Sequence, residues 1–295
     1  VAYEHRHNHA NGEDNRDGHG ENFSWNHGCE GPSHDPRVNA ARAEDLRAML
    51  GTLFASTGTL MLTAGDEFGR SQHGNNNAYC QDNVISWFNW GALSEDARRQ
   101  QSFVGHLTAL RRRFAHLFFE RYVHEPLQTG DPEILWYNGA GELMQASHWQ
   151  EHHARTLGCL PVGVNPATQA RDRLLIVFHA DRNALGLRLP LLEGVAQWEI
   201  LVDTATLSGI PRPDNCMVQQ RLNLFSCSTV VLLARGGERR WLVLPAAVMG
   251  FLLQHAVQGW CPPLPLLRRL GVRTRGEIDR EKYRLLSLLE TEPGA

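Results

Sequence analysis

The chain has 295 residues, of which 42% are hydrophobic and 21% are charged. This composition excludes an intrinsically disordered polypeptide and supplies enough apolar side chains for one large or two medium domains. The formal net charge of −3 gives no electrostatic reason to expect nucleic acid as a partner. The six cysteines show neither a C-x-x-C pair nor the spacing of metal ligands, so we expect reduced, cytoplasmic thiols.

The first predicted elements are a polar loop and a helix. Residues 1–36 are rich in His, Asn, Asp and Gly, and they open on Val1 rather than on an export signal. We therefore expect an irregular surface loop within a longer protein. Asp35 and Pro36 are suited to be an N-cap and a first-turn proline. The apolar residues that follow recur at helical spacing up to Gly58, which predicts an amphipathic helix.

A strand, a long loop and a second helix are expected next. Residues 59–64 are apolar apart from their threonines, as in a parallel strand that is covered on both faces. The segment 64–83 combines glycines, carboxylates, asparagines and aromatic residues, so it is not regular structure. Ser94 predicts the start of a helix whose apolar stripe ends near Phe118. Helix, strand, loop and helix in this order indicate the closing portion of a β/α barrel.

Beyond about residue 120 the pattern changes to short strands separated by Gly, Pro, Asp and Asn turns, which predicts an all-β module. The runs are 134–137, 174–178, 187–189, 198–202 and 228–233. Glycines within 235–238 indicate a boundary. We therefore expect a C-terminal barrel portion at 1–120, an all-β domain at 121–237 and a helical tail at 238–295.

The tail contains an apolar segment, 241–260, that is long enough for a transmembrane helix, although Pro245 and three polar residues interrupt it. Residues 241–284 also resemble small uncharacterised bacterial inner-membrane domains. Three interpretations stay open: inner-membrane association, a buried helical hairpin, or out-of-place sequence at the end of a fragment.

The polar loop carries the best candidates for ligand contact. Amides and carboxylates hydrogen-bond sugar hydroxyls, and aromatic rings stack on sugar faces. The candidate substrate-binding residues are Asp66, Glu67, Asn75, Asn76, Asn77, Tyr79, Gln81 and Asp82. The alternative is that the asparagines hold tight turns and that Tyr79 plugs the rim of the barrel.

The chain resembles a known family in three segments. These are Asn8-His9-Ala10-Asn11-Gly12-Glu13-Asp14-Asn15-Arg16-Asp17-Gly18, the loop 64–83, and Ile85-Ser86-Trp87-Phe88-Asn89-Trp90. They look like the bacterial glycogen debranching enzymes of the isoamylase type, in the α-amylase superfamily, closely over 1–120 and more loosely to about 234. The resemblance implies a glycosidase that hydrolyses α-1,6 branch linkages in glycogen or limit dextrin, without a cofactor. It also implies that the all-β domain at 121–237 is a small antiparallel β-sandwich that follows the barrel.

The catalytic groups are the part of that pattern that this sequence lacks. Retaining cleavage needs two carboxyl groups about 5 to 5.5 Å apart, and adjacent residues such as Asp66 and Glu67, leaving a strand in opposite directions, are a poor pair. In the family, the catalytic carboxylates belong to motifs upstream of the segment that matches residues 1–18. We therefore expect a C-terminal portion that depends on a missing N-terminal barrel half. The alternatives are a non-catalytic glucan-binding module, a membrane-tethered remnant, or a partial barrel that does not fold alone.

Other residues are weaker candidates. His5, His7 and His9 alternate, but a loop does not favour metal binding by them, and Ser24 stands where a calcium loop needs Glu. We therefore expect no metal. Cys80 has no partner base placed by the sequence.

Overall fold

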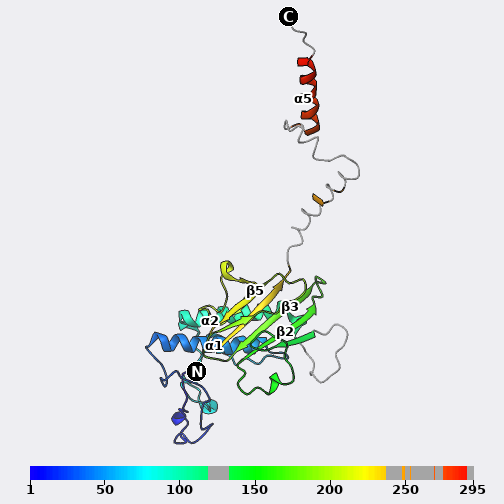
Figure 1. Cartoon of the computed structure of the whole chain (residues 1–295). Coiled ribbons are helices and arrows are strands. Elements are labelled where there is room, and N and C mark those ends of the chain that lie inside the picture. Colours follow the sequence, from blue (N-terminus) through cyan, green and yellow to red (C-terminus); the bar gives the residue numbers. More distant parts are fainter. Residues whose placement is uncertain (119–132, 237–247, 250–252, 254–268, 270–274, 291–295) are drawn as a thin grey trace. The chain divides into compact units, whose positions relative to one another are not determined.

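The computed structural model describes residues 1–118, 133–236, 248–249, 253, 269 and 275–290. The chain divides into two units, Val1–Gly237 and Glu238–Ala295. The first unit contains two long helices and two antiparallel sheets (Figure 1). In the second unit, the described helix is α5 (Arg275–Glu290).

Both predicted helices begin where their capping residues stand. Helix α1 (Pro36–Ala55) follows Asp35, whose side chain accepts a hydrogen bond from the Arg37 backbone N–H. Helix α2 (Glu95–Arg113) follows Ser94, whose hydroxyl accepts from the Ala97 N–H. Such caps satisfy N–H groups that the first turn leaves unpaired.

Helix α1 ends at Ala55, three residues before Gly58, and a side chain of α2 contacts its C-terminal end. The guanidinium of Arg111 donates to the carbonyl oxygens of Phe54 and Ser56 at 2.9 and 2.5 Å, and to that of Gly58 at 2.6 Å. A cation at the negative end of the α1 dipole is favourable. Arg111 therefore fastens the two helices to each other.

The larger sheet has six strands in the order β1-β2-β3-β8-β5-β6, and β4 pairs with β7 in the smaller one. All pairs are antiparallel. The strands are β1 (Glu133–Tyr137), β2 (Thr156–Val164), β3 (Arg171–His179), β4 (Leu185–Arg188), β5 (Gln197–Asp203), β6 (Met217–Val218), β7 (Arg221–Leu224) and β8 (Ser228–Arg235). The antiparallel, sheet-rich part of the fold prediction is confirmed, because all five predicted runs lie at strands.

Each face of the larger sheet is buried against a different partner. On one face, Leu175 and Val177 of β3 join Leu222 and Leu224 of β7 in an apolar core between the two sheets. On the other face, Leu174 and Ile176 join residues of α1, α2 and the turn after α2. Side chains alternate between the faces of a strand, so the continuous apolar run of β3 feeds two cores.

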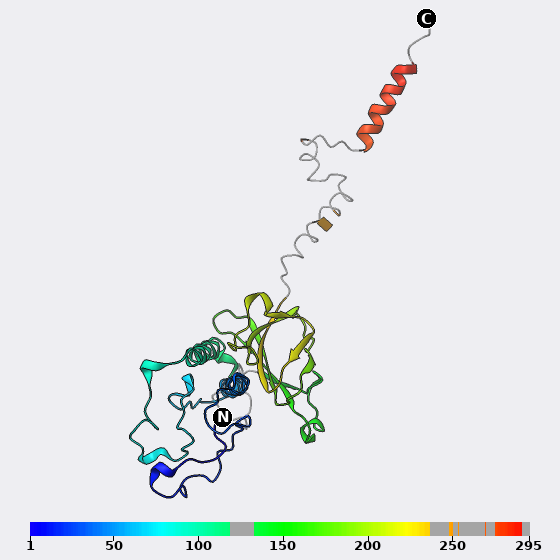
Figure 2. The same cartoon turned by 90° about the vertical axis from the view of Figure 1, so that its left-hand side faces the viewer.

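The helices lie between the sheets and the loops. Figure 2 looks nearly along α1 and α2, with the sheets on one side and the loops 1–35 and 59–93 on the other. The loops contain short 3₁₀ turns, among them Asp66–Phe68 and Ala78–Cys80, and an isolated antiparallel bridge between His5 and Glu21.

The prediction of a parallel strand at 59–64 is wrong. These residues form no strand, and among the described residues none pairs with them. Met61 is 86% exposed, so the segment is not covered on both faces. An apolar run becomes a strand only where a neighbour supplies hydrogen-bond partners.

The predicted transmembrane segment 241–260 lies outside the described residues, apart from 248, 249 and 253. Among the residues that the structure does describe, no helix combines the length and apolar composition that crossing a membrane requires. The predicted division of the chain at residues 120 and 237 stays a prediction.

Candidate functional site

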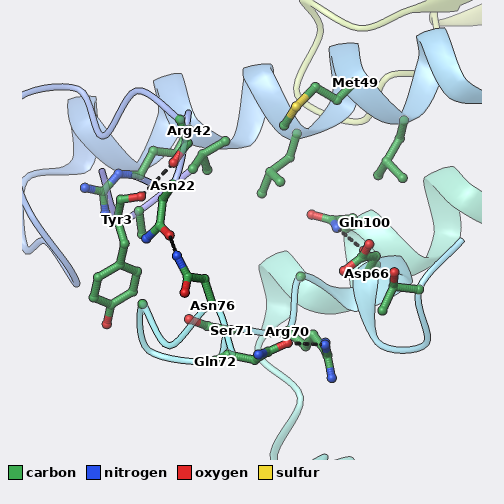
Figure 3. A pocket seen from close by; sticks show the side chains of 18 of the residues that line it. Tyr3, Asn22, Arg42, Met49, Asp66, Arg70, Ser71, Gln72, Asn76 and Gln100 are labelled. Carbon is green, nitrogen blue, oxygen red and sulfur yellow. Dashed lines mark hydrogen bonds between the residues drawn. The ribbon is translucent and has the colours of Figure 1, made fainter. Parts of the chain in front are cut away.

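A cleft of about 690 Å³ lies between α1 and the loops that cover its outer side. Figure 3 shows Met49 of α1 on one side, with Asp66 and Gln100 at one end and Asn22 and Asn76 at the other. We call this hollow the candidate cleft. It is built from segments that lie far apart in the sequence.

One wall of the candidate cleft is apolar. It consists of Leu46, Met49, Leu50 and Leu53 of α1, with Met61 and Leu62 of the extended segment. Met49 is 52% exposed, and Met61 is almost fully so. Contiguous exposed apolar side chains of this kind indicate a surface that is covered by a partner or a ligand.

The opposite rim is polar. It is formed by Tyr3, Asn22, Asp66, Arg70, Ser71, Gln72, Asn75, Asn76 and Gln100. Gln100 of α2 donates from its side-chain amide to the backbone oxygen of Asp66 at 2.6 Å, which ties the 3₁₀ turn to the helix. Arg70 donates to the side-chain oxygen of Gln72. The rim therefore presents carboxylate, amide and hydroxyl groups in fixed positions.

Asp66 is the one carboxylic acid among the described residues that line the candidate cleft. Partial desolvation raises the pKa of its carboxyl group, and the neighbouring Arg70 cation opposes this shift. Glu67 turns back into its own loop, where its carboxylate accepts from the Gly65 N–H at 2.7 Å. The two carboxylates therefore do not face the cleft together, as expected from the sequence. The reason differs from the expected one: both residues lie in a 3₁₀ turn, and not in a strand whose side chains alternate.

Behind the rim, side-chain amides join two loops that are more than sixty residues apart in the sequence. We call this cluster the amide network, and its members are Asn8, Asn11, Asp17, Asn75, Asn76, Asn77 and Gln81. Asn8, which is fully buried, donates to the side-chain oxygen of Asn76 at 2.8 Å and accepts from the Asn76 backbone N–H at 3.0 Å. Asn11 and Asn77 both donate to one carboxylate oxygen of Asp17, at 2.6 and 3.0 Å.

The amide network uses most of the hydrogen-bonding capacity of its members. The side-chain nitrogen of Asn76 donates to the His19 carbonyl and the Asn22 side chain, while its oxygen accepts from Asn8. Although Asn76 itself is exposed, amides that are paired in this way stabilise a loop conformation, and the cost of leaving them unpaired is greatest for buried members such as Asn8 and Asn75. For Asn76, the geometry favours the turn-holding alternative over direct contact with a ligand.

The predicted site residues are distributed over several surroundings. Asp66, Asn75 and Asn76 line the candidate cleft, whereas Asn77 and Gln81 lie in the amide network behind it. Three others lie elsewhere in the loops: Glu67 as described above, Tyr79 with 77% of its surface exposed, and Asp82, which accepts from the indole N–H of Trp87 at 2.8 Å. The exposure of Tyr79 means that it does not plug a rim within the described structure.

Several residues of the cleft carry no signal in the sequence. Tyr3 and Asn22 come from the first loop, Arg42 from α1 and Gln100 from α2. Arg42 is 6% exposed and donates to the carbonyl oxygens of Asn26 at 2.8 Å and Gly31 at 2.8 Å. The sequence pattern of the helix does not distinguish Arg42 from an arginine that faces solvent. Its partners are backbone carbonyl oxygens, which every residue has, so no particular residue type marks them.

Metal binding receives no support from the geometry of the described part of the chain, where no group of three or more His, Cys, Asp or Glu side chains is placed to hold an ion. His7 instead contacts the carboxylate of Glu30 at 2.8 Å. Desolvation disfavours ionisation of Glu30, but hydrogen bonds from the Glu4 N–H, His7, Asn26 and the His5 N–H outweigh it and lower its pKa to about 2.

Comparison with known proteins relates the chain to proteins of glycogen metabolism. No family model matches it. It is 47% identical over 151 residues to a protein of Erwinia tasmaniensis named glycogen debranching enzyme, a match that covers 51% of this chain and 22% of that protein. It is 37% identical over 201 residues to the protein of the same name from Serratia proteamaculans, covering 68% and 27%.

A further relative is a glycogen operon protein GlgX homolog of Mycobacterium tuberculosis, 38% identical over 219 residues, with 69% of this chain and 30% of that protein covered. The chain belongs to the glycogen debranching enzyme family. It spans between about a fifth and a third of the length of these family members. Among solved structures, a Bacillus subtilis pullulanase type I complexed with maltose matches with a TM-score of 0.43 and 17% identity, over 70% of this chain and 24% of that one.

Proposed function

We propose that this chain is the C-terminal portion of a cytoplasmic glycogen debranching enzyme whose intact form hydrolyses α-1,6-glucosidic branch linkages in glycogen or limit dextrin. The identity of 37–47% to family members that carry this name is the observation that supports the proposal most strongly. The part played by this chain is to contact the branched α-glucan, through the candidate cleft and the loops beside it.

The order of elements supports a barrel portion at 1–120. Helix α1, the extended segment 59–64, a polar loop and helix α2 follow one another as they do at the end of a β/α barrel. The apolar wall of the cleft, with Met49 and Met61 exposed, is then the surface against which the missing N-terminal barrel half packs.

The polar rim suits a carbohydrate. A carboxylate accepts hydrogen bonds from two adjacent hydroxyls, and amides donate and accept at once, which matches the mixed hydrogen bonding of a sugar. Asp66 is the rim group that we assign to direct contact, together with the exposed ring of Tyr79 in the same loop. Gln72 accepts from Arg70 and donates to the Asn75 carbonyl oxygen at 2.9 Å, so we assign it a supporting role. Asn75, Asn76, Asn77 and Gln81 hold the loops beside the cleft in place through the amide network, and we assign Glu67 and Asp82 the same supporting role.

The catalytic groups are assigned to the missing part of the enzyme. Retaining cleavage requires a nucleophile and an acid on separate carboxyl groups about 5 to 5.5 Å apart. Asp66 has no second carboxylic acid beside it among the described residues of the cleft lining. This observation also favours an alternative function, that of a non-catalytic α-glucan-binding module.

Glucan contact is tested by affinity electrophoresis of the purified chain through gels with and without glycogen. We expect glycogen to retard the chain, and we expect Asp66→Ala and Tyr79→Ala to weaken that retardation several-fold. Asp14→Ala is the matched control, because the Asp14 side chain is 87% exposed and its pair with Arg16 lies on the surface. Equal mobility of the chain with and without glycogen contradicts the proposed contact.

Catalysis is tested separately by measuring reducing-sugar release from limit dextrin. The chain alone is expected to release no more than buffer, and co-expression with the N-terminal part of a family member is expected to restore release. Hydrolysis by the chain alone contradicts the assignment of the catalytic groups. A glucan-binding complex that stays inactive when both parts are present supports the non-catalytic alternative.

A further inference from the structure

A second hollow, of about 720 Å³, lies in the β-sandwich and shares no residue with the candidate cleft. It opens between two connections, the one from β1 to β2 (138–155) and the one from β3 to β4 (180–184). We call it the tryptophan pocket after Trp149, which lies in a 3₁₀ turn of the first connection.

The Trp149 ring is held in place although it is open to solvent. Its edge contacts the ring of Trp136 in β1, with ring centres 5.7 Å apart and planes at 74°. About half of Trp149 (52%) remains exposed, and its indole N–H makes no hydrogen bond to any residue that the structure describes. A fixed, exposed indole offers an apolar face for stacking and a free donor at its edge.

The groups around the ring suit a neutral polar ligand. His148 accepts a hydrogen bond from the Gln145 N–H at its Nδ1 atom (3.2 Å), so its neutral ring carries the proton on Nε2 and offers a donor. The Asp181 carboxylate is an acceptor, since the backbone N–H of Asn183 lowers its pKa and keeps it ionised. His153 lines the pocket without a side-chain partner among the described residues, and it is exposed.

The opposite wall is preformed rather than adaptable. His179, which is 4% exposed, contacts the Thr156 hydroxyl through Nδ1 and the Asn183 carbonyl through Nε2, both at 2.8 Å. These two bonds fix the 180–184 turn against β2. A site whose walls are set before binding loses less entropy when a ligand enters.

Charge argues against a phosphate or another anion in this pocket. Glu151 and Asp181 contribute negative charge, and the guanidinium of Arg155 donates to the carbonyl oxygens of His152 and Ala154 rather than into open space. An aromatic face with separate donors and acceptors matches a sugar, which has apolar C–H faces and hydroxyls at its edge.

We propose that the tryptophan pocket is a second carbohydrate-binding site, in which one sugar ring stacks on Trp149 and its hydroxyls meet His148, His153 and Asp181. The assignment of the sugar as part of an α-glucan rests on the proposed function, whereas the assignment as a carbohydrate rests on the pocket. Such a site keeps a glucan on the protein while another part of it occupies the candidate cleft.

The test is titration of the full chain with maltoheptaose by calorimetry, accompanied by electrophoresis in glycogen. Trp149→Ala is expected to weaken the second binding event about five-fold, the order expected for loss of one aromatic stacking contact. Trp149→Phe is expected to retain most of the binding. Leu191→Ala is the control, because Leu191 is 85% exposed in the same sandwich but lies outside the pocket. Unchanged melting temperatures establish that each variant is folded.

The outcomes separate this inference from the proposed function. If Trp149→Ala binds like the unmodified chain while Asp66→Ala binds less, the tryptophan pocket is overturned and the candidate cleft stands. If only Trp149→Ala loses binding, the pocket stands and the proposed cleft contact fails. Trp149-dependent binding of cellopentaose in preference to maltoheptaose overturns the α-glucan assignment of the pocket. Absence of any binding overturns both sites.

Discussion

The β-sandwich and the loops beside α1 are held together by different forces. Between the sheets, Leu160, Leu224 and Leu232 are completely buried in an apolar core. In the loops 1–35 and 59–93, Phe68 is the one hydrophobic residue among those described that is buried, and amides take the place of a core. Apolar burial is non-directional and tolerates exchange, whereas hydrogen bonds fix atoms in position. The loops are therefore positioned by the hydrogen bonds of particular side chains, whereas the sandwich is stabilised by many apolar contacts together.

The largest expected effect comes from the sandwich. Trp198 is 1% exposed in the core between the sheets, so Trp198→Ala removes a large apolar side chain and leaves a cavity. We expect a loss of about 3–5 kcal/mol in the free energy of unfolding. Urea denaturation followed by circular dichroism measures it, with Leu207→Ala as the control because Leu207 is 68% exposed. A loss below about 1 kcal/mol would show that the core collapses around the gap.

The second effect tests the loops. Asn8→Ala removes three side-chain hydrogen bonds of a fully buried residue and leaves the Asn76 N–H without its partner. We expect a loss of about 1–3 kcal/mol in unfolding free energy. Hydrogen exchange should increase in 8–22 and 72–83 and stay constant in the sandwich.

Asn39→Ala is the control for this change. Asn39 is exposed on α1 and donates to the Ser33 carbonyl, so its loss should cost about 0.5 kcal/mol or less. If both variants exchanged equally fast in 72–83, the amide network would not be what holds these loops.

The smallest expected effect depends on pH. Glu30 has a pKa of about 2 in the folded chain, against an ordinary value of 4.5, so its ionised form stabilises the fold. This stabilisation is complete above about pH 4.5 and is lost as the pH falls through about 2. Glu30→Gln keeps one oxygen acceptor but loses the charge, and it should cost about 1 kcal/mol at pH 7.

Melting temperatures of both proteins between pH 7 and pH 2 check this prediction. The difference should shrink on acidification, and Glu193→Gln, a change at an exposed position, should show no such trend. If the difference in melting temperature between the two proteins stays constant down to pH 2, the loss of stability in Glu30→Gln is due to the changed shape of the side chain and not to its lost charge.

The features that could be predicted from the sequence are those that depend on residues close to one another along the chain. Asp35, Pro36 and Ser94 signal the starts of both helices because a cap acts within three residues. Strand β2 was missed, since Gly158, Pro161 and Gly163 interrupt its pattern and proline normally argues against an inner strand. Its ladder with β3 is in fact broken at Leu160 and Pro161.

The candidate cleft was only partly accessible to such reasoning. Asp66, Asn75 and Asn76 were identified because the loop is chemically unusual. The partners of these residues were not, because Asn8 and Asn76 lie 68 positions apart and a single sequence carries no sign of their pairing. The prediction of a strand at 59–64 was wrong for the same reason, because the composition of this apolar run does not reveal whether a second strand lies beside it to pair with.

Because β3 is buried on both faces, its apolar residues do not by themselves determine its register against the neighbouring strands. Leu174 to Val177 are aliphatic at every position, so sliding the strand by one residue would still fill both cores. In most sheets an amphipathic pattern forbids such a slip. Here the information must come from the polar ends, where His179 bonds Thr156 and Asp172 accepts from Asn165 at 3.1 Å. These terminal hydrogen bonds therefore select one strand register among several that would bury similar apolar surface.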